Sequence, residues 1–122
     1  MVNEETIKQA ADILAEKFHP YRIILFGSYA RGVADEHSDV DLLVVTEAAE
    51  KKNRIKLMTE MSQTLDGRGY AKDIVVLSPD EYETDKDIPG TIARYVSQEG
   101  RLLYERKRKR GQKESKRMAA AR

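Results

Sequence analysis

The chain has 122 residues, which is enough for one compact domain and too few for two. Hydrophobic residues make up 40% of it and charged residues 35%, which predicts a water-soluble globular domain with a modest core. The absence of cysteine excludes disulfides, thiolate metal sites and a cysteine nucleophile, and two histidines far apart disfavour a zinc site. We therefore expect any bound metal to be held by oxygen atoms.

Charge is distributed unevenly along the chain. Residues 105–122 contain nine Lys or Arg and two Glu, whereas residues 1–104 carry a net negative charge. We expect residues 1–104 to form the folded domain and residues 105–122 to be a basic tail that is disordered in isolation. The tail is either a solubilising end or a docking arm for an acidic protein or nucleic acid, and it lacks the interleaved aromatic residues of a base-stacking surface.

Nothing in the sequence predicts contact with a membrane. No apolar run approaches the roughly 20 residues that a membrane helix needs. The first residues, MVNEETIKQA, lack the basic and then apolar pattern of a secretory signal. We expect a cytoplasmic protein with no membrane partner.

The first half of the chain predicts a helix, a strand, a turn and a second strand. Asn3 is a good cap for a helix that Pro20 would end. Its apolar residues recur at helical spacing: Ile7, Ala10, Ala11, Leu14 and Phe18. Residues 21–26 form an apolar β-rich run, residues 28–32 allow a short helical turn, and residues 39–46 form a second strand. We expect the two strands to pair as neighbours.

The second half predicts the same kinds of element in a different order. Residues 47–65 form a charged amphipathic helix, and residues 73–77, DIVVL, form a third strand. The apolar stripe expected to face inward along that helix is Ile55, Met58, Met61 and Leu65. Pro79 opens a turn or short helix, a last helix ends near Gly100, and residues 101–105 form an edge strand. This order predicts an α/β (α+β) sandwich: a small mixed sheet with helices packed mainly on one face.

Two aspartates stand at the head of the second predicted strand. Asp39 and Asp41 are two residues apart, so their side chains point to the same face of the sheet. Two like charges beside a buried apolar strand repel each other and lose hydration, unless a cation lies between them. Magnesium prefers hard oxygen ligands and commonly takes one or two carboxylates plus phosphate oxygens and water. The alternative is that both are loop or cap carboxylates at a strand edge.

Three further positions predict a phosphate site near this pair. Gly27 and Ser28 end the first strand, where a glycine lets a phosphate approach the backbone and a serine hydroxyl can donate. Arg31 is either a phosphate clamp or an ordinary surface cation. Asp73 begins the third strand, and its carboxylate would converge on the pair if the second and third strands are adjacent; otherwise it is a solvated strand-end acid. The six tyrosines are interpreted as packing residues of the core and its rim.

The segment GSYARGVADEHSDVDLLVV, residues 27–45, resembles the signature of the DNA-polymerase-β-like nucleotidyltransferases. That signature consists of Gly-Ser, a spacer of about ten residues, Asp-x-Asp on a strand, and a third acid on a later strand, which Asp73 matches. The resemblance covers residues 20–104, since residues 87–105, DIPGTIARYVSQEGRLLYE, are similar to the end of the minimal single-domain members. It implies a polymerase-β-like nucleotidyltransferase fold.

The resemblance also implies a reaction and a set of site residues. Asp39 and Asp41 would hold the magnesium that accompanies ATP, and Asp73 would bind a second metal ion or act as the general base. The nucleotide would be bound by Gly27, Ser28 and Arg31. The product of the attack at the α-phosphorus would be an AMP adduct and pyrophosphate.

The chain resembles the minimal members of this superfamily, which are typically encoded beside a HEPN-domain ribonuclease toxin. The resemblance therefore implies a prokaryotic toxin–antitoxin pair in which this chain transfers AMP from MgATP to a tyrosine of the toxin. The alternative is an antitoxin that binds nucleotide without catalysis and neutralises the toxin by occlusion. Transfer to an antibiotic is disfavoured, because the chain has no room for a domain that would bind the drug.

Overall fold

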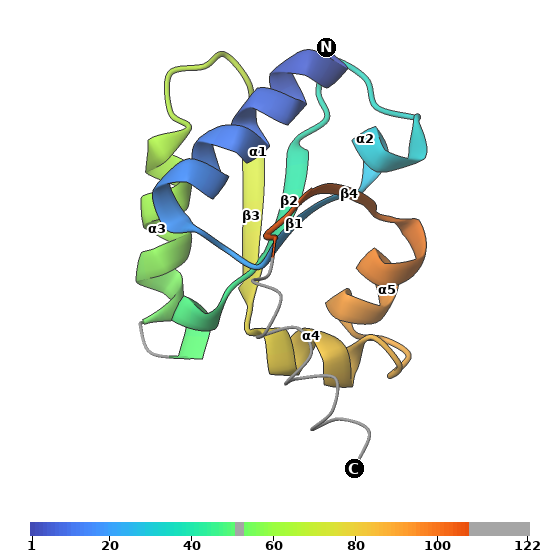
Figure 1. Cartoon of the computed structure of the whole chain (residues 1–122). Coiled ribbons are helices and arrows are strands. Elements are labelled where there is room, and N and C mark those ends of the chain that lie inside the picture. The colour runs from blue at the N-terminus through green and yellow to red at the C-terminus, as the bar shows by residue number, and fades with distance from the viewer. Residues whose placement is uncertain (51–52, 108–122) are drawn as a thin grey trace.

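The computed structural model describes residues 1–50 and 53–107, which fold into one α/β domain (Figure 1). The elements, in chain order, are α1 (Glu4–Phe18), β1 (Arg22–Phe26), α2 (Ser28–Arg31), β2 (Val40–Val45), the 3-10 helix η1 (Glu47–Glu50), α3 (Arg54–Thr64), β3 (Lys72–Leu77), α4 (Pro79–Asp85), α5 (Ile92–Glu99) and β4 (Arg101–Glu105). No helix in the described part of the chain combines the length and apolar character needed to span a membrane.

The four strands form one mixed sheet in the order β3-β2-β1-β4. β1 pairs antiparallel with β2 and with β4, which confirms the predicted pairing of the first two strands. β2 and β3 are parallel, and α3 supplies the crossover that a parallel pair requires. The predicted mixed α/β fold is therefore confirmed, with β3 and β4 at the two edges.

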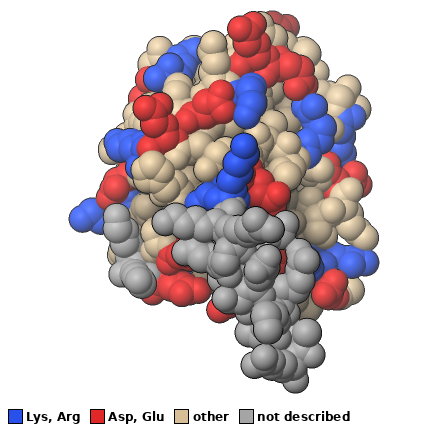
Figure 2. All heavy atoms as spheres, viewed as in Figure 1, with Lys and Arg blue, Asp and Glu red and all other residues tan. Residues whose placement is uncertain are grey.

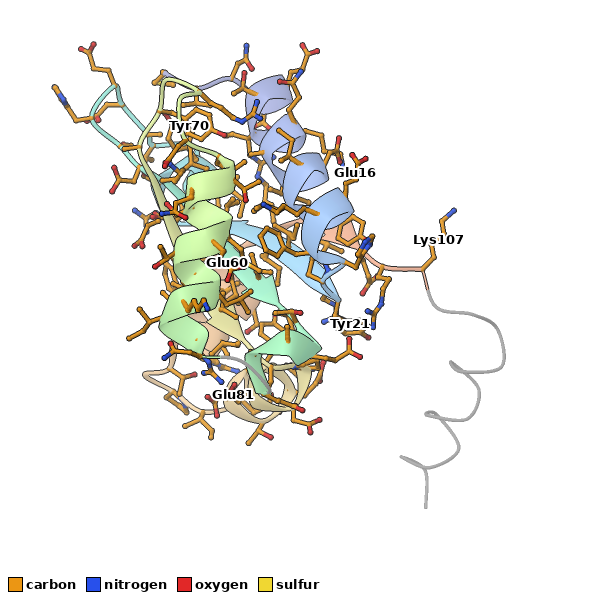
Figure 3. The ribbon with its side chains drawn as sticks, turned by 90° about the vertical axis from the view of Figure 1, so that its left-hand side faces the viewer. Glu16, Tyr21, Glu60, Tyr70, Glu81 and Lys107 are labelled. Carbon is orange, nitrogen blue, oxygen red and sulfur yellow. The ribbon has the colours of Figure 1, made fainter. Side chains whose placement is uncertain are left out.

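Helices cover the sheet on both faces (Figure 1). The two longer helices, α1 and α3, pack side by side on one face, as Figure 3 also shows, over the apolar residues that alternate along β1 and β2. The buried strand residues on that face are Ile23, Leu25, Val40, Leu42, Val44, Ile74 and Val76. The short helices α4 and α5 cover the intervening residues on the other face: Ile24, Phe26, Leu43, Val45 and Leu77. Both faces of the central strands are thus dry, which explains their nearly continuous apolar sequence.

The first helix begins and ends where its sequence predicts. The Asn3 side chain accepts a hydrogen bond of 2.8 Å from the Thr6 N–H, so it caps the helix. His19 takes a left-handed conformation with φ 49° at the C-cap, and Pro20 follows. Phe18 is only half-buried, and Ala15 takes the last fully packed position on the inward stripe.

The predicted helix over residues 47–65 was wrong in its extent, and its predicted inward stripe was wrong at Ile55. Two separate elements, η1 and α3, occupy this range, and residues 51–52 between them lie outside the described part of the chain. Asn53 caps α3 by accepting from the Lys56 N–H at 3.1 Å, so the helix has its own start. From that start, Leu57, Met61 and Leu65 face the sheet at a spacing of four. Ile55, two residues before Leu57, points to solvent and is 74% exposed.

The end of the domain reaches slightly past the predicted boundary. β4 continues to Glu105, which forms an ion pair of 2.7 Å with Arg22. The Arg106 backbone N–H donates to the Tyr21 carbonyl at 2.9 Å, and its guanidinium pairs with Glu47 at 2.7 Å. The predicted basic tail lies outside the described residues from residue 108 onward. On the part of the face that Figure 2 shows uncovered, acidic and basic side chains of the described residues are interspersed.

An ion pair joins α3 to α4 at the foot of the molecule, where Figure 3 labels Glu81. Arg54 donates to both carboxylate oxygens of Glu81, at 2.6 and 3.0 Å, and Glu81 also accepts from the Ser78 N–H at 2.9 Å. Chiefly because Arg54 donates to it, the pKa of the Glu81 carboxyl falls from 4.5 to about 2. Because this pKa is lowered, the stability that the ionised Glu81 contributes to the fold is fully present above about pH 4.5 and is lost as the pH falls through about 2.

Replacing Arg54 with alanine is therefore expected to lower the free energy of unfolding at pH 7 by about 1 kcal/mol, a value reduced for the partial exposure of both side chains. Urea unfolding of both proteins at pH 7 and at pH 2 measures it, and the difference should be much smaller at the lower pH. Lys86→Ala, which removes an exposed pair with Glu83 on a single helix, is the matched control with a cost of no more than about 0.5 kcal/mol. Equal losses in the two variants at pH 7 would contradict the expectation.

Candidate active site

The sharp turn at the end of β1 is made by Gly27. It has φ 75° and ψ −155°, a conformation that side-chain-bearing residues rarely adopt. A Cβ atom built on Gly27 would collide with the carboxylate of Asp41, which occupies the space beside the glycine. The missing side chain therefore has two uses here: it permits the turn, and it lets the Asp41 carboxylate lie against the backbone.

The three predicted acids lie on one face at one end of the sheet. Asp41 stands opposite Asp73 in the parallel pairing of β2 with β3, and opposite Phe26 in the antiparallel pairing of β2 with β1. Directly opposed residues of neighbouring strands point to the same face, about 5 Å apart along the sheet. Asp39 immediately precedes β2 and shares the face of Asp41 by the period of two. Strand pairing thus brings together carboxylates that are more than thirty residues apart in sequence.

Asp39 is presented by a compact turn before β2. The Asp35 N–H donates to the Ser38 hydroxyl at 2.9 Å, and the Asp35 carboxylate accepts from the His37 N–H at 2.9 Å. On the other side of Asp39, the Val40 N–H donates to the carbonyl of Ala71 at 2.9 Å. These bonds fix the chain on both sides of the aspartate.

The carboxylates are not neutralised by ion pairs. None of Asp39, Asp41 and Asp73 forms an ion pair or a side-chain hydrogen bond with another residue in the described part of the chain. Burial raises the pKa of the half-buried Asp41 from 3.8 to about 6, with Asp73 and Asp39 adding to the rise and Arg31 opposing it. Asp39 and Asp73 are exposed. The site is therefore a concentration of negative charge that a cation would relieve.

Within the described residues, no three or more acidic or histidine side chains are arranged to hold a metal ion by themselves. A complete ligand shell is thus not formed by protein atoms alone. The donors that are present are hard carboxylate oxygens, which is the class that magnesium prefers, and magnesium usually completes its shell with water and substrate phosphates. The chemistry of Asp39 and Asp41 therefore fits a nucleotide-bound magnesium ion.

The predicted phosphate-binding residues lie beside these acids. Ser28 begins α2, directly after Gly27, and is half-buried. No side chain caps this helix, but α2 has only four residues and so lacks the dipole of a full helix. Arg31 ends α2, is exposed, and donates from Nη1 to the hydroxyl of Tyr95 at 2.6 Å.

Tyr95 is the residue that the sequence interpretation missed. The sequence predicts packing roles for the tyrosines, and the Tyr95 ring does pack, in a T-shaped contact with Phe26 at a centroid distance of 6.3 Å. Its hydroxyl, however, is joined to a predicted site residue 64 positions away in sequence. No local spacing rule links the two positions, so only the folded structure reveals the contact.

Comparisons with known proteins agree with this geometry. Residues 7–119 match the nucleotidyltransferase domain family. The chain is 36% identical over 106 residues to a Methanocaldococcus jannaschii protein named "Putative protein adenylyltransferase MJ0604", covering 85% of this chain and 100% of that relative. A solved "putative nucleotidyltransferase" from Sulfolobus solfataricus is 25% identical, with a TM-score of 0.58 over 81% of this chain and 77% of that one.

A chain in the crystal structure of a toxin–antitoxin complex with AMP-PNP shares the fold, with a TM-score of 0.51 and 21% identity over 82% of this chain and 74% of that one. At that identity the likeness concerns the fold. The family match spans most of the sequence, and the alignment with the Methanocaldococcus protein covers that relative from end to end. The chain therefore belongs to the nucleotidyltransferase family.

Proposed function

We propose that this chain is a protein adenylyltransferase that acts as an antitoxin, transferring AMP from MgATP to a tyrosine of a HEPN-domain toxin. The observation that carries the proposal is the placement of Asp41 against Gly27 on one side and opposite Asp73 on the other. This arrangement sets the carboxylates of Asp41 and Asp73 beside the Gly27-Ser28 turn. Clustered like charges destabilise the empty protein, and a bound magnesium–nucleotide complex would relieve that cost, which supports a nucleotide site here.

In the proposed reaction, the acceptor hydroxyl oxygen attacks the α-phosphorus of ATP in line. The bond from the α-phosphorus to the oxygen that bridges to the β-phosphorus breaks, and pyrophosphate leaves with that oxygen. The hydroxyl proton passes to the exposed carboxylate of Asp73, or to solvent if Asp73 is a metal ligand. Gly27 and Ser28 offer backbone and hydroxyl donors to the triphosphate, and Arg31 offers a cation.

Magnesium, when bound by Asp39 and Asp41, would neutralise triphosphate charge and the charge that develops on the leaving oxygen. The protein's own part is to hold these two carboxylates on one face, at the head of a strand that is buried on both sides. That rigid placement is a large share of the catalysis expected in phosphoryl chemistry.

The acceptor is proposed to be a protein for reasons of size and relationship. A single small domain with its site at the sheet edge has no second lobe among the described residues to hold a small acceptor. The relative that is aligned over its whole length is named "Putative protein adenylyltransferase MJ0604", and one structure with the same fold is that of a toxin–antitoxin with AMP-PNP. AMP attached beside the ribonuclease site of the toxin would repel RNA phosphates, so the modification would itself neutralise the toxin.

Incubating the purified partner toxin with this protein and MgATP is expected to add the mass of one or more AMP units to the toxin and to release pyrophosphate. Intact-mass spectrometry of the toxin measures the addition, and RNA cleavage assayed after the two proteins are separated measures neutralisation. Asp12→Asn is the matched control, because this exposed aspartate lies on α1, on the opposite face of the sheet, and its loss should leave transfer intact. Toxin that regains full activity and carries no added mass would refute covalent neutralisation and leave occlusion as the mechanism.

A further inference from the structure

Arg31 is held in place by a residue from a distant part of the chain. Its Nη1 donates to the Tyr95 hydroxyl at 2.6 Å, across 64 positions of sequence. In the described part of the chain this is the one hydrogen bond that the Arg31 side chain forms. An exposed arginine has many accessible rotamers, and a short bond to a fixed acceptor removes much of that freedom.

Tyr95 is itself rigidly mounted. The neighbouring α5 residues Ala93 and Val96 are fully buried against the sheet. The helix is capped by Thr91, which accepts from the Arg94 N–H at 3.1 Å and donates to the Asp85 carbonyl at 2.7 Å. Its start is therefore tied to the end of α4. The acceptor for the guanidinium thus belongs to a packed helix, whereas Arg31 belongs to a four-residue turn of helix.

The Tyr95 ring lies at the same end of the sheet as the carboxylates. The ring forms a T-shaped contact with Phe26 at 87° between planes, and Phe26 pairs with Asp41 across β1 and β2. Arg31 acts electrostatically on Asp41, so the guanidinium is within range of the carboxylate site. A guanidinium has five N–H donors, and the bond to Tyr95 leaves the others available for an anion.

We propose that Tyr95 is a positioning residue that holds the Arg31 guanidinium toward the triphosphate. This inference rests on the proposed function, since it assumes that the anion beside Arg31 is a nucleoside triphosphate. Tyr95 does not touch the reacting atoms. It lowers the entropy that Arg31 loses when the nucleotide binds, and it thereby links α5 to the nucleotide site.

The test compares Tyr95→Phe, Arg31→Ala and the double variant with wild type. Phenylalanine keeps the ring contact with Phe26 and removes only the hydroxyl, so thermal stability should change little. Calorimetric binding of ATP with magnesium to the full chain is expected to weaken roughly three- to tenfold in Tyr95→Phe and further in Arg31→Ala, in line with a hydrogen bond to a charged group at a partly exposed site. The double variant should bind as weakly as Arg31→Ala alone, because Tyr95 acts only through Arg31.

Tyr104→Phe is the control, since Tyr104 is also half-buried and its hydroxyl forms no hydrogen bond with a described residue. The proposal would be overturned if the two single losses add up in the double variant. It would also be overturned if Tyr95→Phe binds ATP like wild type while Arg31→Ala is impaired, or if wild type binds no ATP. Where the partner toxin is modified, the KM for ATP should rise in Tyr95→Phe with little change in kcat. Wild type that binds ATP but never transfers AMP would refute the proposed function alone, because the binding comparison still decides the role of Tyr95.

Discussion

Replacing Asp41 with asparagine is expected to reduce AMP transfer by more than about a hundredfold. Even the loss of a residue that only hydrogen-bonds to a metal ligand typically lowers metal affinity or activity by about 10–100-fold, and Asp41 would be a ligand itself. Asparagine keeps the shape of the side chain and removes the charge that would hold magnesium. The space beside Gly27 stays filled, so the backbone turn is preserved. Pyrophosphate release with MgATP and the partner toxin measures the loss, and transfer at the wild-type rate would refute the metal assignment.

The same substitution is expected to stabilise the metal-free protein. The pKa of Asp41 is raised from 3.8 to about 6, so the folded state holds a proton that the unfolded state has already released. Stability contributed by this group is therefore greatest below about pH 4 and declines as the pH rises toward 6. With allowance for solvent around this half-buried carboxylate, Asp41→Asn should gain about 1 kcal/mol at pH 7.

Urea unfolding in a chelator at pH 4 and pH 7 measures this gain, which should be present only at the higher pH. Chelation is needed because a bound cation stabilises only the form that binds it. Asp39→Asn is the matched comparison: it should impair transfer similarly, but its exposed carboxylate should give a smaller gain in stability. A destabilised Asp41→Asn protein at pH 7 would show that the carboxylate is compensated in the folded state.

Gly27→Ala is expected to damage both the fold and the activity. The new methyl group would meet the Asp41 carboxylate and would also force alanine into a conformation with φ 75°. Backbone strain of this kind costs about 1–3 kcal/mol, and displacement of the carboxylate adds to it. We expect the free energy of unfolding to fall by about 2–4 kcal/mol. Transfer should fall by more than about a hundredfold, because Asp41 can no longer lie against the turn.

Gly67→Ala is a control for a positive φ without a collision. Gly67 has φ 80°, similar to Gly27, but nothing lies within 4 Å of its added Cβ. This control should lose only the strain component, about 1 kcal/mol, and should transfer AMP normally. Urea unfolding and the pyrophosphate assay on both variants make the comparison. Equal losses of stability in the two variants would show that the collision with Asp41 has no energetic consequence.

Much of the secondary structure follows from local rules that the sequence displays directly. Asn3 and Pro20 bound the first helix, because one supplies a cap and the other cannot continue a helix. The apolar runs of β1, β2 and β3 were each located to within one residue of their observed ends. The spacing from Gly27-Ser28 to Asp39 and Asp41 carried the resemblance to the nucleotidyltransferases, and the family match confirms that resemblance.

The inward face of α3 could not be predicted from the local sequence pattern alone. Its apolar residues allow two inward stripes, one that starts at Ile55 and one that starts at Leu57, and both continue through Met61 and Leu65. The stripe that is buried is decided by where Asn53 starts the helix and by how the helix lies on the sheet. Both depend on packing against strands that are distant in sequence.

Three features of the site were decided by the tertiary structure alone. The parallel pairing of β2 with β3 sets Asp73 opposite Asp41, and the antiparallel pairing of β1 with β2 brings the Asp41 carboxylate against Gly27. The packing of α5 brings Tyr95 to Arg31. Strand order, register and helix docking are selected by burying two apolar faces at once, a constraint on the whole chain that no short segment carries. The sequence by itself therefore indicated the candidate site residues, and the fold decided which of them meet.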